Sequence, residues 1–235
     1  MDRRDFLTAG KTKKATPVNP IAFASPTRTL SGINPYTGPW TVNEVIHLLK
    51  RTMFGAKKAD VDFFAAMSMN QAVDALLNVP LAQFTPAPPI KNYAISVDPA
   101  DPDNAIAAGQ TWVNINTNDG SVDSNRTNAY RNWWIGQMVN QNRNILEKMT
   151  LFWHNHFATE TDSIGRAIWC YQNNTVLRKN ALGNFKQFAR EITLDTGMLF
   201  YQNGYLNTNA APDENYGREL QELFVVGKGA DNATQ

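Results

Sequence analysis

Apolar and aromatic residues recur at spacings of three and four from residue 126 onward, and this periodicity constrains the fold more than any other feature. Such spacing lines up side chains on one face of an α-helix, because each residue turns about 100° around the helix axis. The period-two alternation of half-buried strands is nearly absent. The sequence therefore predicts an all-α fold, a multi-helix bundle-like domain with a long irregular insertion, whose short loops favour antiparallel neighbours.

Capping residues and glycines set the predicted boundaries of the helices. Thr41 and Glu44 fit a capping box at the start of the first helix, and Gly55 fits a left-handed cap at its end. Asp213 is expected to cap the start of the last helix, and Gly227 to end it. The other helices are predicted over residues 59–67, 71–77, 126–141, 145–157, 164–178 and 184–193.

The chain divides into three regions of different composition. Residues 1–39 are rich in proline, threonine and lysine, and are expected to form a disordered leader. Residues 40–235 are expected to form the helical domain, interrupted by an irregular insertion over 81–124 that is rich in proline and asparagine. Arg3, Arg4, Phe6 and Leu7 match a twin-arginine export signal, but the apolar segment that such a signal needs does not follow.

Composition excludes several classes of protein. The 235 residues include 43% hydrophobic residues, enough for a sizeable core, with 22 basic and 21 acidic side chains. This balance gives no signal for nucleic acid or an anionic membrane surface, and no apolar run approaches the roughly 20 residues of a membrane span. Cys170 is the only cysteine, which excludes an internal disulfide and a cysteine zinc cluster, and it is expected to be a buried, inert thiol.

The segment from Glu147 to Phe157 holds two of the three histidines of the chain. On a helix, His154 falls on the same side as Glu147 and Thr150, whereas His156 falls on the opposite side, so one metal ion cannot bind both histidines. The predicted buried face consists of Ile145, Met149, Phe152, Trp153 and His156. The simplest interpretation of His156 is a core histidine that bonds one polar neighbour.

A candidate catalytic site combines this polar face with the last predicted helix. His154 is its candidate base or metal ligand, Glu147 would orient His154, and Arg218 would contact an anion. Glu219, beside the apolar stripe of the last helix, and His47 on the first helix are further candidate metal ligands. The alternative is structural: the acidic residues stabilise a helix start, and Arg218 pairs with Glu222. The sequence identifies no cofactor.

Four motifs, in this order, carry a family resemblance. They are a His-Leu-Leu-x-Arg-x-x-Phe-Gly motif over 47–55, the segment 147–157, an Asn-Ala-Leu-Gly-Asn-Phe motif over 180–185, and a Glu-Asn-Tyr motif within 212–224. Together they cover roughly residues 44–228, and the chain resembles the domain of unknown function 1800 family. The resemblance implies a bacterial protein, a variable insertion at 81–124 and a fragment of a longer chain. It supplies no reaction and no catalytic residue.

Two hypotheses for the function follow. In the first, the chain belongs to an envelope or extracellular enzyme that uses His154, Glu147, Glu219 and Arg218, with the insertion as a lid. In the second, it is a non-catalytic scaffold or a glycan- or peptide-binding module, whose stacking surface is provided by Trp112, Trp133 and Trp134. An extracellular polymer or a protein is then the expected partner. The resemblance implies a periplasmic or extracellular location, and a non-functional signal would imply a cytoplasmic one.

Overall fold

A computed structural model describes residues 35–117, 119–212 and 214–227. The chain divides into two units, and nearly all described residues belong to the second, Pro39–Gln235. The twin-arginine motif and Asp213 lie outside the described residues. Within the described part the fold is all-α, as predicted, with a single isolated bridge between Ile90 and Thr111 in place of a sheet. No described helix has the length and apolar character to cross a membrane.

Three short helices open the second unit: α1 (Val42–Thr52), α2 (Lys58–Ala65) and α3 (Met69–Leu77). The predicted capping box at Thr41 is present, and Ser68 with Gln71 forms a second one before α3. Their shared core is built from Val45, Leu49, Met53, Val61, Phe64, Ala72 and Leu76. The predicted glycine cap is wrong, because α1 ends at Thr52 and its C-cap is Met53 in an extended conformation.

The proline-rich segment after α3 is irregular but has buried anchors. It contains two short 3-10 helices, Leu81–Phe84 and Pro102–Ala105. The side chains of Lys91, Asp103 and Trp112 are almost completely buried, so parts of the segment belong to the core. Trp112 is fully buried and offers no stacking surface, so the sequence prediction was wrong for that residue.

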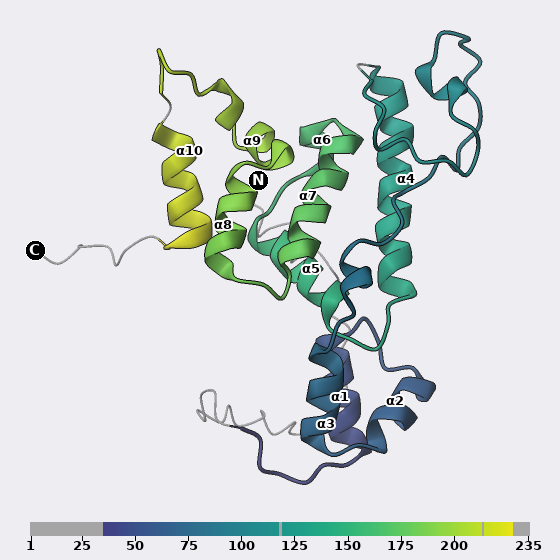
Figure 1. The fold of residues 1–235 in the computed structure, drawn as a ribbon, viewed down its shortest axis with the longest axis vertical. Coiled ribbons are helices and arrows are strands. Elements are labelled where there is room, and N and C mark those ends of the chain that lie inside the picture. Colours follow the sequence, from purple (N-terminus) through teal and green to yellow (C-terminus); the bar gives the residue numbers. More distant parts are fainter. Residues whose placement is uncertain (1–34, 118, 213, 228–235) are drawn as a thin grey trace, which may run out of the picture. The chain divides into compact units, whose positions relative to one another are not determined.

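The long helices are α4 (Gly120–Val139), α5 (Leu146–His156) and α7 (Ala167–Asn180). Helix α4 begins six residues before its predicted start, because the Asp119 carboxylate accepts hydrogen bonds from the amides of Ser121 and Val122. Helix α7 packs against α4, α5, α8 (Phe185–Thr193) and α9 (Thr196–Tyr201), as Figure 1 shows. The sequence predicted neither α9 nor the single turn α6 (Thr161–Ile164) as separate helices.

Two apolar clusters flank α7. One joins α7 to α4 and the insertion, and consists of Ile106, Trp112, Ala129, Tyr130, Ile164, Ala167, Ile168 and Cys170. The other joins it to the C-terminal segments, and consists of Phe157, Leu177, Phe188, Ile192, Met198, Tyr216 and Phe224. The C-terminal part of this cluster comes from α10 (Glu214–Glu219) and from a π-helix over Leu220–Val225. Gly227 adopts the positive φ of +82° expected of a terminating glycine.

Candidate functional site

Glu147, the predicted partner of His154, is paired with another residue. Its carboxylate forms a two-pronged ion pair with the guanidinium of Arg178 on α7, with Nη2–Oε2 at 2.9 Å and a second, shorter contact from Nη1. Both side chains are more than nine-tenths buried. Glu147 therefore faces α7, where it joins two helices.

His154 packs against a tryptophan and is not paired with either acidic candidate among the described residues. Its ring lies edge-on to Trp134 with centroids 4.9 Å apart. Burial lowers its pKa below the ordinary value, which favours the neutral imidazole near neutral pH. Among the described residues, no hydrogen bond or ion pair joins His154 to Glu147 or Glu219. Its catalytic role stays a prediction.

The remaining candidates lie at more exposed positions. Arg218 contacts Glu219, its neighbour in the chain, at 3.5 Å. The predicted pair with Glu222 is wrong, because the helix widens to a π-helix at Leu220 and the spacing of four no longer brings side chains together. His47 is exposed on α1. Within the described ranges, no three His, Cys, Asp or Glu side chains gather as metal ligands would.

The predicted burial of α5 is wrong, because the five residues expected on its buried face are all half-buried or exposed. Glu147 and Thr150, expected on the exposed side, are buried, whereas Phe152 is 52% exposed. The reason is that Arg178 on α7 provides a buried partner for the acidic side of α5. His156 is half-buried, and it bonds one polar neighbour as predicted: its Nε2 lies 2.6 Å from the carbonyl oxygen of Phe224. Cys170 is buried, and burial raises the pKa of its thiol to about 12, in keeping with an inert cysteine.

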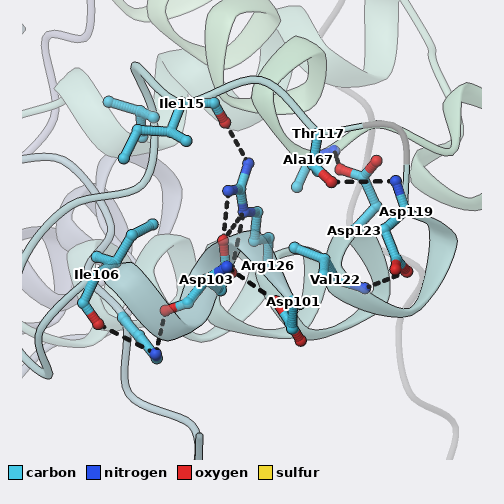
Figure 2. Close-up of polar contacts among 12 residues, drawn as sticks. Asp101, Asp103, Ile106, Ile115, Thr117, Asp119, Val122, Asp123, Arg126 and Ala167 are labelled. Atoms are coloured by element: carbon cyan, nitrogen blue, oxygen red, sulfur yellow. Dashed lines mark hydrogen bonds and ion pairs between the residues drawn. The ribbon is translucent and has the colours of Figure 1, made fainter. Parts of the chain in front are cut away.

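A buried charge network that the sequence did not predict fixes the insertion to α4. Arg126 donates from Nε and Nη2 to the Asp103 carboxylate and from Nη1 to the carbonyl of Ile115, as Figure 2 shows. Asp103 also accepts a hydrogen bond from the Tyr93 hydroxyl. Lys91 donates to the carbonyl oxygens of Asp103 and Ile106, the latter at 3.0 Å. Every nitrogen of the Arg126 guanidinium therefore has an acceptor.

A second carboxylate of α4 fixes the start of α7. Asp123 is 4% exposed, and its Oδ1 accepts a hydrogen bond of 3.1 Å from the backbone amide of Ala167 (Figure 2). Its Oδ2 lies 3.2 Å from Nη1 of Arg166, which also donates to the carbonyl of Thr117. Asp123 thus serves as a cap from outside the helix, since Arg166 at the N-cap position makes no capping bond.

These contacts form one wall of a cleft of about 380 Å³ at the N-terminal end of α7. Its lining consists of Asn116, Thr117, Asp123, Arg166, Ile168 and Trp169. The Trp169 ring begins a row of three aromatic rings. Its centroid lies 5.1 Å from that of Phe200, which stacks on Tyr205 at 5.0 Å with 14° between the ring planes. Tyr205 is 54% exposed, so the row ends at the surface.

Sequence reasoning found none of these cleft residues. Asn116 and Thr117 belong to the insertion, whereas Phe200 and Tyr205 lie more than 80 residues later in the chain. The one available signal was local: Arg166 and Trp169 stand at the start of a predicted helix, three residues apart. No periodicity relates the other positions, because tertiary packing alone brings them together.

The comparisons with known proteins identify one matching family. The model of a family described as "Protein of unknown function (DUF1800)" matches residues 47–233, which is most of the chain. No curated protein matches, and no solved structure does. The four sequence motifs all lie inside the matched range. The chain therefore belongs to the DUF1800 family.

Proposed function

We propose that this helical unit is a non-catalytic binding module that recognises a carbohydrate at the cleft beside Trp169. The row of aromatic rings that runs from this cleft to the exposed Tyr205 carries the proposal. The C–H bonds on the flat face of a pyranose ring pack on an aromatic ring, whose electron-rich face attracts them. Phe200 and Tyr205 stack face to face, so the ring surface left for a sugar lies at the ends of the row.

The polar lining of the cleft supplies the second requirement of sugar recognition. A sugar hydroxyl both donates and accepts hydrogen bonds, so it needs acceptors and donors nearby. Asn116 and Thr117 provide exposed or half-exposed groups of both kinds, beside the carboxylate of Asp123 and the guanidinium of Arg166. The two charges form an ion pair at 3.2 Å, which favours a neutral ligand over a strongly anionic one.

The enzyme hypothesis has less support in the geometry. Glu147 is held by Arg178, and Arg218 contacts Glu219, so the contacts of the described residues do not gather the predicted catalytic groups around His154. A secreted location, as the family resemblance implies, would bring the module to an extracellular polymer. The secreted location is itself part of what we propose.

The test measures binding of soluble oligosaccharides to the purified chain. The probes are the hexaoses of cellulose, chitin and starch, and the measurement is titration calorimetry. At least one probe is expected to bind, and Trp169→Ala is expected to weaken it by about tenfold or more. Tyr205→Ala should weaken it less, since that ring lies at the far end of the row.

Phe152→Ala is the matched control, because Phe152 is 52% exposed and lies on α5, outside the cleft and the row. Its variant should bind as tightly as the wild type. The proposal fails if no hexaose binds, or if Trp169→Ala and Phe152→Ala bind equally well.

A further inference from the structure

A second cleft has a different chemical character and shares no lining residue with the first. It has a volume of about 370 Å³ and lies between the segment that follows α1 and the C-terminal end of α4. Its apolar lining includes Met53, Phe54, Ile135, Met138 and Val139. Ile135 and Val139 are each more than half exposed, so apolar surface continues to the rim. Small-molecule sites are commonly mostly apolar concavities of about 300–1,000 Å³.

The charged groups of this cleft are already engaged. The ammonium group of Lys57 donates to the carbonyl oxygen of Val139 at 3.3 Å. Asp60 accepts a hydrogen bond of 2.8 Å from Nε of Arg143. Asp60 is thus paired with a cation, and the charge of Lys57 is exposed to solvent, so neither side chain offers a buried counter-charge to a ligand.

Gln141 is the uncharged polar side chain in the lining. Its Oε1 atom is shielded from solvent, and no group within the described part of the chain donates a hydrogen bond to it. Buried amide oxygens nearly always have a donor, because an unmet acceptor loses its hydration without compensation. A donor from a bound molecule would meet this requirement.

We propose that this cleft binds a small neutral amphipathic molecule, with an aliphatic body on the apolar lining and one hydrogen-bond donor on Gln141 Oε1. The two methionine side chains suit an aliphatic body, because unbranched thioethers adjust their shape to irregular ligands. This inference is independent of the carbohydrate cleft, and neither depends on the other.

The test compares two isomers that differ in the donor alone: octanol and heptyl methyl ether. Both are titrated into the purified chain carrying isotope-labelled methionine methyl groups, and the methyl resonances are followed by NMR. Octanol is expected to shift the resonances of Met53 and Met138 and to bind about tenfold more tightly than the ether.

Gln141→Met removes the acceptor while keeping the length of the side chain. Octanol should then bind this variant only as tightly as the ether does. Gln172→Met, at an exposed position of α7, is the matched control and should retain the preference for octanol. The proposal is overturned by unshifted Met53 and Met138 resonances, by equal affinities of the two isomers for the wild type, or by a Gln141→Met variant that still prefers octanol.

Discussion

Two buried carboxylate–guanidinium pairs in this protein have similar burial and different surroundings. Asp103–Arg126 joins the insertion to α4, and each side chain is at most 3% exposed. Glu147–Arg178 joins α5 to α7 and is almost as buried. In the first pair, every guanidinium nitrogen has an acceptor. In the second, Nε of Arg178 has no acceptor among the described residues.

The difference shows that burial alone does not define what an ion pair contributes. Removing two charges from water is costly, and the cost is recovered only when the remaining donors and acceptors also find partners. The insertion pair meets this condition and can order an otherwise irregular segment. The pair between α5 and α7 meets it partly, so its contribution to stability depends on keeping both partners.

The largest effect is expected from Arg178→Met. The substitution leaves Glu147 buried without a cation, and the free energy of unfolding should fall by about 3–5 kcal/mol. Denaturant titration measures this loss. The double variant Glu147→Leu/Arg178→Met removes both charges and should recover most of the stability. A single variant that loses less than about 1 kcal/mol would show that the pair is not buried in solution.

Arg126→Met tests the fully bonded pair. Asp103 keeps the hydrogen bond from Tyr93, so a smaller loss of about 1.5–3 kcal/mol is expected. The loss should also be local. Amide hydrogen exchange is expected to rise across residues 91–115 while α5, α7 and α8 keep their protection. A uniform rise in exchange over all helices would contradict the view that this network orders the insertion.

Two adjacent asparagines on α7 allow a matched comparison. Nδ2 of Asn173 donates to Asp195 at 2.8 Å in a buried contact, so Asn173→Leu should destabilise the protein by about 1–3 kcal/mol. Asn174 is fully buried, and neither its Nδ2 nor its Oδ1 has a hydrogen-bond partner within the described part of the chain. Asn174→Leu should therefore change the stability by less than about 1 kcal/mol. Equal losses in thermal or denaturant unfolding would show that ordered water bonds Asn174.

The smallest effect concerns the pH dependence of stability near His154. Burial lowers the pKa of the folded-state imidazole, so the unfolded chain binds the proton more readily. Stability should therefore fall as the pH drops below the unfolded-state pKa of about 6.5, and should level off below the folded-state pKa. His154→Gln is expected to flatten this part of the profile. His47→Gln, which leaves His154 in place, should retain the slope. Equal slopes for His154→Gln and wild type would contradict the assignment.

Periodicity and capping chemistry were sufficient to predict the all-α class and most of the helices. These signals are local, so each can be recognised within a short stretch of sequence. The single turn α6 and the short helix α9 were missed, because a segment of four to six residues is too short to show a periodic face. The start of α4 was missed because it lies in a segment rich in asparagine and serine. The residue that caps this start is Asp119.

The candidate site was less predictable than the fold. The phase of α5 correctly separated the two histidines, but it could not show that Arg178, thirty-one residues later, would pair with Glu147. The same holds for Asp103 and Arg126, which are separated by 23 residues. Opposite charges at such distances in sequence have many possible partners, and only the packing of the helices selects one.

The π-helix over Leu220–Val225 has a consequence for how this family can change in length. A π-helical segment corresponds to a residue inserted into an α-helix, since its hydrogen bonds span five positions in place of four. Deleting Gln221 would let the segment relax into a regular α-helix. The extra residue of a π-helical turn is taken up within that turn, so the residues after the deletion would keep roughly their orientation relative to α10. Phe224 would then stay beside Phe157 and His156. A deletion of one residue should therefore be tolerated at this segment, whereas in a regular α-helix it would turn the following residues by about 100°.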